Sequence, residues 1–376
     1  MNLSLAPLLI ALPLTSVGGD ATHPGTANGV SAELEIQEPA AAKVQKAEEA
    51  DVMLGTKDHR YRWVPGWLKL PEGMKLGNTH GCVAVDSKGR VYFNTDSEHA
   101  VVVVNPDGTV ANSWGAEWKG GLHGMCLTKE ADGKEYLYLA HIGRHMAAKT
   151  TLDGEVLWTL PWPKASGKYE SEGQYKPTGI AVAPDGRIFV ADGYGQSWVH
   201  RYSKDREYLG SFGGLGAEPG QMRTPHGVVI ETIGDTSYVV VCDRANRRVQ
   251  RFDLDGNLVR SEAPKLQRPC SGVFTAGILA VAELGGGVAL LGLDENGERQ
   301  FIDRLGENPE PSRRGQNGVP VEQWAAGQFL SPHGVGADAE GNLFVLDWNR
   351  NGRVSKLERV SPLPKASSVG APAGGK

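Results

Sequence analysis

One sequence pattern recurs six times between residues 80 and 350, and this repetition constrains the fold more than any other feature. In each copy a residue followed by glycine opens an apolar run, a turn of the Asp-x-x-Gly kind follows, and a second apolar run then usually ends in an acid. HGCVAVDSKGRVYFNTD, TGIAVAPDGRIFVAD and HGVGADAEGNLFVLD are the clearest copies. The six copies start at His80, His123, Thr178, His226, Ser271 and His333.

Each copy predicts a β-hairpin, because two apolar runs flank a tight turn. Third strands are expected in AVVVVNPDG, WVHRYSKD, RVQRFDLDG and VSKLERV, and the starts lie 43 to 62 residues apart. That spacing is typical of one four-stranded propeller blade. The last copy has no fourth strand of its own, and YRWVPGW near Tyr61 could supply it and close the ring. We therefore predict an all-β, six-bladed propeller over residues 59–361.

The two ends of the chain differ in composition from the repeats. Residues 1–19 contain an apolar run followed by small residues and are predicted to be a signal peptide, so we expect an exported, periplasmic or secreted protein. Residues 20–58 are predicted to be a flexible linker and 362–376 a disordered tail. A net charge of −5 without a basic stripe gives no reason to expect nucleic acid, and no apolar run is long enough to span a bilayer. A monomer is expected.

Four cysteines are too few and too scattered for a disulfide framework. None forms a CxxC pair, so a thiolate zinc site is not expected, and Cys82 and Cys126 are interpreted as small core residues.

The histidines should gather at one face of the propeller. The first strand of each blade lines the channel, so the starting residues of all six copies face one axis. Four of these are histidines: His80, His123, His226 and His333. Neutral imidazole suits zinc or another divalent transition metal, and three histidines with a water make an open catalytic zinc site. The alternative is that each histidine only bonds backbone in a tight turn.

The loops after the second strands should reach the same face, because that strand is antiparallel to the first. They carry Tyr194, Arg244 and Arg144, together with several aspartates interpreted as turn and inter-blade acceptors. Near a divalent cation Tyr194 could act as a general base, and Arg244 could bind a carboxylate. Equally, Tyr194 could be a wall residue and Arg244 part of a structural Arg–Asp pair. The insertion at residues 304–329 could be a substrate-selecting lid or a passive loop.

The stretches KPTGIAVAPDGRIFVADGYGQS, GAEPGQMRTPHGVV, CDRANRRVQRF and FLSPHGV resemble NHL-repeat propellers, and most closely the peptidyl-α-hydroxyglycine α-amidating lyase family. The resemblance runs from about Gly77 to Leu357. It implies zinc held by His123, His226 and His333, with Tyr194 as the base and Arg244 as the substrate-binding arginine. The implied reaction cleaves an N-acyl-α-hydroxyglycine, a small molecule or peptide C-terminus, to an amide and glyoxylate.

Several positions depart from the family pattern. A second family arginine is replaced in the segment Asn94-Thr95-Asp96, where Arg144 of the next blade is the candidate substitute. His80 adds a fourth histidine, and Gly334 stands where the family has a calcium-binding aspartate, so Ca²⁺ stays possible but is not supported by this residue. Two other functions therefore stay open: a metal-dependent hydrolase or oxygenase, and a non-catalytic exported binding propeller.

Overall fold

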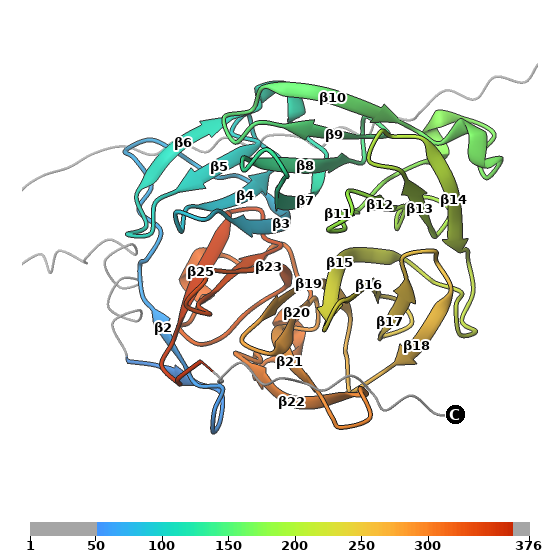
Figure 1. Ribbon diagram of the computed structural model, residues 1–376. Coiled ribbons are helices and arrows are strands. Elements are labelled where there is room, and N and C mark those ends of the chain that lie inside the picture. Colours follow the sequence, from blue (N-terminus) through green and yellow to red (C-terminus); the bar gives the residue numbers. More distant parts are fainter. Residues whose placement is uncertain (1–50, 364–376) are drawn as a thin grey trace, which may run out of the picture. The chain divides into compact units, whose positions relative to one another are not determined.

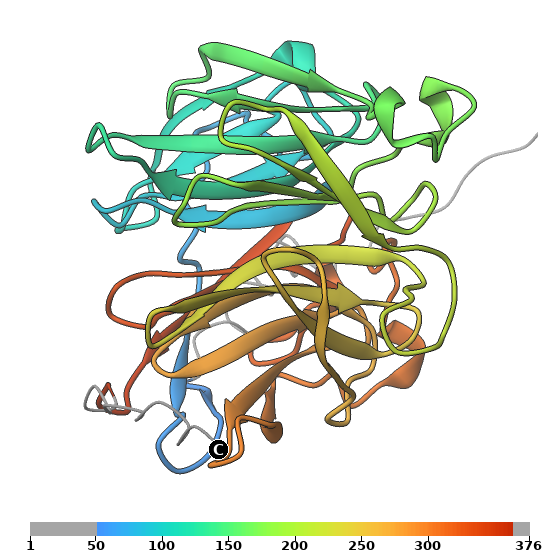
Figure 2. The same cartoon turned by 45° about the vertical axis from the view of Figure 1, so that its right-hand side comes forward.

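The computed structural model describes residues 51–363, which form six antiparallel β-sheets around one axis (Figures 1 and 2). The predicted six-bladed all-β propeller is thus confirmed. The innermost strands β3, β7, β11, β15, β19 and β23 contact one another in sequence around the ring, and β23 returns to β3. Histidines at the starts of these strands therefore meet at one end of the channel.

Five blades each take four consecutive strands. They comprise β3 (Thr79–Val85), β4 (Val91–Thr95), β5 (Val101–Val104) and β6 (Val110–Trp114); β7 (Leu122–Lys129), β8 (Glu135–His141), β9 (Met146–Thr150) and β10 (Val156–Pro161); β11 (Gly179–Val182), β12 (Ile188–Ala191), β13 (Trp198–Tyr202) and β14 (Tyr208–Gly213); β15 (Pro225–Ile233), β16 (Thr236–Asp243), β17 (Arg248–Asp253) and β18 (Leu258–Glu262); and β19 (Pro269–Thr275), β20 (Ile278–Glu283), β21 (Gly287–Leu293) and β22 (Arg299–Leu305).

The sixth blade closes the ring with strands from both ends of the described chain. Its order is β1 (Met53–Leu54), β2 (Tyr61–Val64), β25 (Arg353–Arg359), β24 (Leu343–Asp347) and β23 (Pro332–Ala337). Tyr61 pairs with Arg359, as the YRWV segment predicts. The predicted linker extends too far toward the C-terminus, because β1 lies within it and pairs with β2 in this sheet. The predicted signal peptide, the rest of the linker and nearly all of the tail lie outside the described residues.

The blades pack on one another through their apolar second strands, and a tight turn joins the first strand of a blade to the second. Strand β4 is buried throughout, and clusters of Val, Leu and aromatic side chains fill the space between neighbouring sheets. The turn after β3 shows the local cause of the pattern: the Asp86 carboxylate accepts the amides of Lys88 and Arg90, and Gly89 takes a positive φ of 75°.

Short 3-10 helices are the only helices of the described chain: η1 (Ala116–Trp118), η2 (Lys164–Ser166), η3 (Glu172–Gln174), η4 (Pro311–Arg313) and η5 (Val321–Gln323). Within residues 51–363, none is long and apolar enough to cross a membrane.

Candidate metal centre

The four channel histidines, His80, His123, His226 and His333, lie together at the start of their strands. Ring centroids of neighbouring pairs are 4.6 Å apart for His80–His123, 4.7 Å for His80–His333, 4.7 Å for His123–His226 and 4.6 Å for His226–His333. His123 and His333 lie 5.0 Å apart across the middle of the group. The predicted convergence on the axis is therefore present in the structure.

Three of the rings are oriented by the backbone of the next blade. Nδ1 of His123 lies 2.7 Å from the Thr178 carbonyl, and Nδ1 of His226 lies 2.8 Å from the Cys270 carbonyl. Nδ1 of His333 lies 3.1 Å from the carbonyl of Gly81. A carbonyl can only accept, so each Nδ1 carries the proton and each Nε2 is an unprotonated electron-pair donor.

The freed Nε2 atoms suit a metal ion. His123 and His333 are almost completely buried, and their Nε2 atoms have no hydrogen-bond partner. Burial holds the pKa of His123, His226 and His333 well below the ordinary histidine value, so the rings are neutral at neutral pH. The donor atoms of His80, His123 and His333 lie within 4.8 Å of one another. Neutral, unpaired, converging imidazoles with backbone-fixed orientation are the ligand set that zinc and related ions take.

Tyr194 and Arg244 join the histidines from the loops after β12 and β16. The Tyr194 hydroxyl lies 3.1 Å from Nε2 of His226 and accepts a hydrogen bond of 3.2 Å from Nη1 of Arg244. The guanidinium also lies over the tyrosine ring, 5.2 Å from its centroid. Burial raises the pKa of Tyr194, and the neighbouring Arg244 charge opposes this rise. These contacts with His226 and Arg244 favour a role of Tyr194 at the histidines over its interpretation as a wall residue of the channel.

The Arg–Asp pair that we considered for Arg244 is made by another residue. Arg248 donates to the Asp243 carboxylate at 2.7 Å, and the same carboxylate accepts the Arg223 amide. Likewise Asp347 accepts the Leu330 and Ser331 amides. The loop aspartates serve as acceptors between segments, as predicted, and Arg244 keeps most of its donors available.

Arg144 lies apart from this group. Its guanidinium packs over the Trp118 ring at 5.3 Å and donates to the Glu117 carbonyl. Among residues 51–363 it makes no contact with the channel histidines. In this structure Arg144 therefore does not take the place of the second family arginine.

Comparison with known proteins agrees with this fold. The NHL repeat family matches residues 175–202. The chain is a six-bladed β-propeller, and one of its segments matches the NHL repeat. Human NHL repeat-containing protein 3 is 28% identical over 207 residues, covering 52% of this chain and 57% of that protein. A probable peptidyl-α-hydroxyglycine α-amidating lyase of Caenorhabditis elegans is 26% identical over 198 residues, covering 48% and 54%.

The chain thus spans about half the length of these curated relatives. It resembles the amidating lyases at about a quarter sequence identity. Among solved structures, a gluconolactonase from Xanthomonas campestris has a TM-score of 0.53 at 15% identity, covering 85% of this chain and 97% of that one. This last likeness concerns the fold alone.

His80 reaches the channel because β3 carries an extra residue. From Thr79 to Val83, strand β3 advances by four residues while its partner β4 advances by only two. At the equivalent place, strand β15 advances by three residues. Asn94 fills the resulting bulge, accepting the Cys82 amide at 2.8 Å and donating to the His80 carbonyl at 2.9 Å. Gly81 has a φ of 148°, and a Cβ there would overlap the Asn94 amide. Asn94, in the segment where the second family arginine is absent, therefore supports His80, the fourth channel imidazole.

The fifth blade contributes a residue that we did not predict. We placed Ser271 at the channel position because it precedes glycine, but the strand register places Cys270 there. In three blades the proline that opens the inner strand pairs with the acid that ends the second strand: Pro225–Asp243, Pro269–Glu283 and Pro332–Asp347. The residue after each proline is His226, Cys270 or His333. Aligning the copies on this proline, rather than on the glycine, would have identified Cys270.

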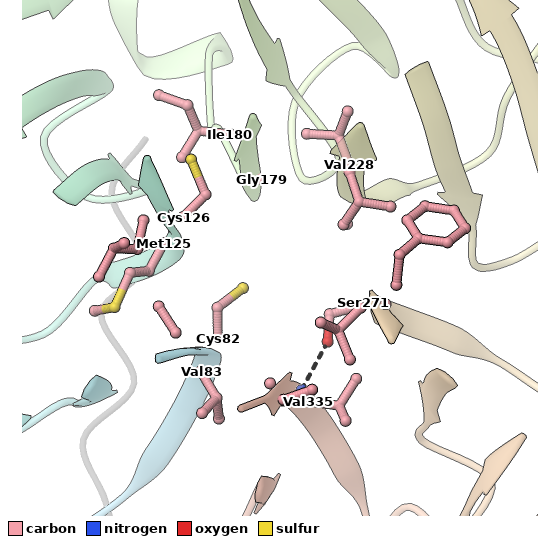
Figure 3. Close-up of a pocket in the computed structure, with 18 of the residues that line it drawn as sticks. Cys82, Val83, Met125, Cys126, Gly179, Ile180, Val228, Ser271 and Val335 are labelled. Atoms are coloured by element: carbon pink, nitrogen blue, oxygen red, sulfur yellow. Dashed lines mark hydrogen bonds between the residues drawn. The ribbon is translucent and has the colours of Figure 1, made fainter. Parts of the chain in front are cut away.

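Beyond the histidines the channel widens into an apolar chamber of about 290 Å³ (Figure 3). Its wall includes Cys82, Met125, Ile180, Val228 and Val335. None of the lining side chains is a carboxylate, whereas Ca²⁺ takes six to eight oxygen ligands.

The insertion between β22 and β23 lies toward the histidine end of the channel. The Asn317 amide donates to the Asn78 side chain at 2.7 Å, next to the start of β3, and the Asn317 carbonyl accepts the Arg350 amide. The lid and the passive loop both remain compatible with this position.

Proposed function

We propose that this NHL-repeat propeller is a metal-dependent lyase, similar to the peptidyl-α-hydroxyglycine α-amidating lyases, that cleaves N-acyl-α-hydroxyglycines. The observation that carries the proposal is the hydrogen-bonded row Arg244–Tyr194–His226 beside two buried histidines with unpaired Nε2 atoms. It brings a metal-ligand set, a phenol and a carboxylate-binding cation together.

The channel histidines would hold Zn²⁺ or another divalent transition metal, which supplies Lewis-acid polarisation of the substrate oxygen when bound. Arg244 retains donors beyond the one on Tyr194 and can bind the glycine carboxylate. The same guanidinium opposes the rise that burial causes in the pKa of Tyr194, and together with a bound divalent cation it would favour the phenolate form, which can accept a proton.

The reaction then needs one proton to move. Tyr194 Oη takes the proton of the substrate α-hydroxyl, the oxygen electrons form the carbonyl of glyoxylate, and the C–N bond breaks with its electrons on nitrogen. Tyr194 returns the proton to that nitrogen, which leaves as the amide. Burial of the site excludes water that would compete for these hydrogen bonds.

The test is glyoxylate release from N-benzoyl-α-hydroxyglycine by zinc-loaded protein. Tyr194→Phe and His226→Ala should each lower kcat/KM by at least about 100-fold, the low end of a general-base contribution. Tyr208→Phe, which changes a phenol bonded to Ser211 on an outer strand, should keep full activity. If zinc-loaded wild-type protein releases no glyoxylate from any N-acyl-α-hydroxyglycine, the lyase proposal is wrong.

The bulge that carries His80 favours a second candidate, oxygen chemistry at a four-histidine iron centre, because a fourth imidazole leaves less open coordination for a zinc lyase. Metal analysis of purified protein separates the two, since zinc performs no redox chemistry.

A further inference from the structure

The fifth blade brings a sulfur atom to the channel histidines. Cys270 is fully buried. Its Sγ, a ring nitrogen of His226 and a ring nitrogen of His333 all lie within 4.8 Å of one another. The carbonyl of the same cysteine accepts the His226 Nδ1–H bond at 2.8 Å. Backbone geometry therefore fixes where the thiol and the imidazole lie relative to one another.

The two sides of this arrangement differ in their protein partners. The Cys270 thiol has the Arg268 carbonyl as a distant acceptor at 3.7 Å, and the Arg244 guanidinium lies beside the sulfur. Nε2 of His333 is buried without any partner. A buried acceptor left unpaired is unfavourable, so an ion bound by Nε2 of His333 would relieve that penalty.

Repeat position supports the same conclusion. Cys270 follows the strand-opening proline as His226 and His333 do, so the blade places its side chain at the same height and toward the same axis. By contrast Cys242 lies in the packed core between two blades. A cysteine is a metal ligand as a thiolate, and with histidine it favours zinc, cobalt or copper over calcium, magnesium or manganese.

We propose that Cys270 is a ligand of the channel metal, so that the centre is a mixed histidine–thiolate site. This inference rests on the metal of the proposed function but not on its reaction. As the metal–sulfur bond forms, the thiol S–H bond breaks and its proton passes to solvent; no electrons are exchanged. The thiolate cancels one unit of metal charge.

The experiment replaces the bound metal by Co²⁺ and records the absorption spectrum of the full chain. Wild-type protein should bind one Co²⁺ and show a near-ultraviolet sulfur-to-cobalt charge-transfer band. Cys270→Ser should still bind Co²⁺ but lose that band entirely, and the matched variant Cys242→Ser should keep it. X-ray absorption at the zinc edge of the wild-type protein should count one sulfur neighbour, which does not depend on the variant folding.

Stoichiometric Co²⁺ without a sulfur band in the wild-type protein would overturn the thiolate ligand and leave the proposed metal site standing. A band that persists in Cys270→Ser would also overturn it, because the sulfur would come from elsewhere. Absence of glyoxylate release with an intact band would overturn the lyase and leave Cys270 as a ligand. If the protein binds no Co²⁺ at all, both the metal site and its thiolate are wrong.

Discussion

Acid should destabilise the metal-free protein through the channel histidines. Burial holds the pKa of His123, His226 and His333 well below the ordinary value of about 6.5. Below that pH the unfolded chain takes up protons that the folded protein excludes. Stability that is present above about pH 6.5 is therefore lost as the pH falls through this value.

The size of the effect follows from linkage. A histidine that titrates near 6.5 when unfolded and stays neutral when folded costs about 1.4 kcal/mol between about pH 7.5 and about pH 5.5. Three such residues together cost about 4 kcal/mol. Domains are typically stable by about 5–15 kcal/mol, so the loss should be large enough to measure directly.

The assay is urea unfolding of chelator-treated protein at these two pH values. His333→Asn removes one titrating ring, and its amide can still donate to the Gly81 carbonyl that now accepts Nδ1. The free energy lost on acidification should shrink by about 1.4 kcal/mol in this variant. Thr178→Val alters the equivalent position of another blade, where no imidazole stands, and should leave the acid effect unchanged. Equal acid effects in His333→Asn and wild-type protein would refute the reasoning.

Three further outcomes are expected. Glu231→Ala should lower the free energy of unfolding by about 3–5 kcal/mol in urea, because it removes the buried carboxylate 2.9 Å from Arg251. Glu358→Ala, on an exposed pair, should cost much less, and equal costs would contradict the argument. Asn94→Ala should cost about 2 kcal/mol and weaken Co²⁺ binding measured by titration, since Asn94 supports the bulge that carries His80. Removing calcium with a selective chelator should leave the melting temperature unchanged, because the chamber offers no carboxylate; a lower melting temperature would show a calcium site.

The sequence identified some of the residues at the channel but not the contacts between them. His80, His123, His226 and His333 were visible because each opens a copy of the repeat, and Tyr194 and Arg244 because they lie in the loops after second strands and in motifs that resemble a known family. Their mutual contacts were not visible, since the 3.2 Å bond from Arg244 to Tyr194 joins loops of two blades. Arg144 shows the converse: a loop position at the correct face does not lead to the site when Trp118 offers a nearer partner.

Repetition alone determined the architecture, because every unit encodes its own hairpins and only a closed ring of such units buries their faces and covers their edges. The tertiary structure decided which side chains reach the axis. The pairing of Pro269 with Glu283 brings Cys270 to the channel position in place of Ser271, and an additional residue in β3 lets His80 keep the channel position that the sequence pattern predicted. The physical reason is strand register: a shift of one residue turns a side chain to the opposite face of a sheet, and register is set by pairing with the neighbouring strand.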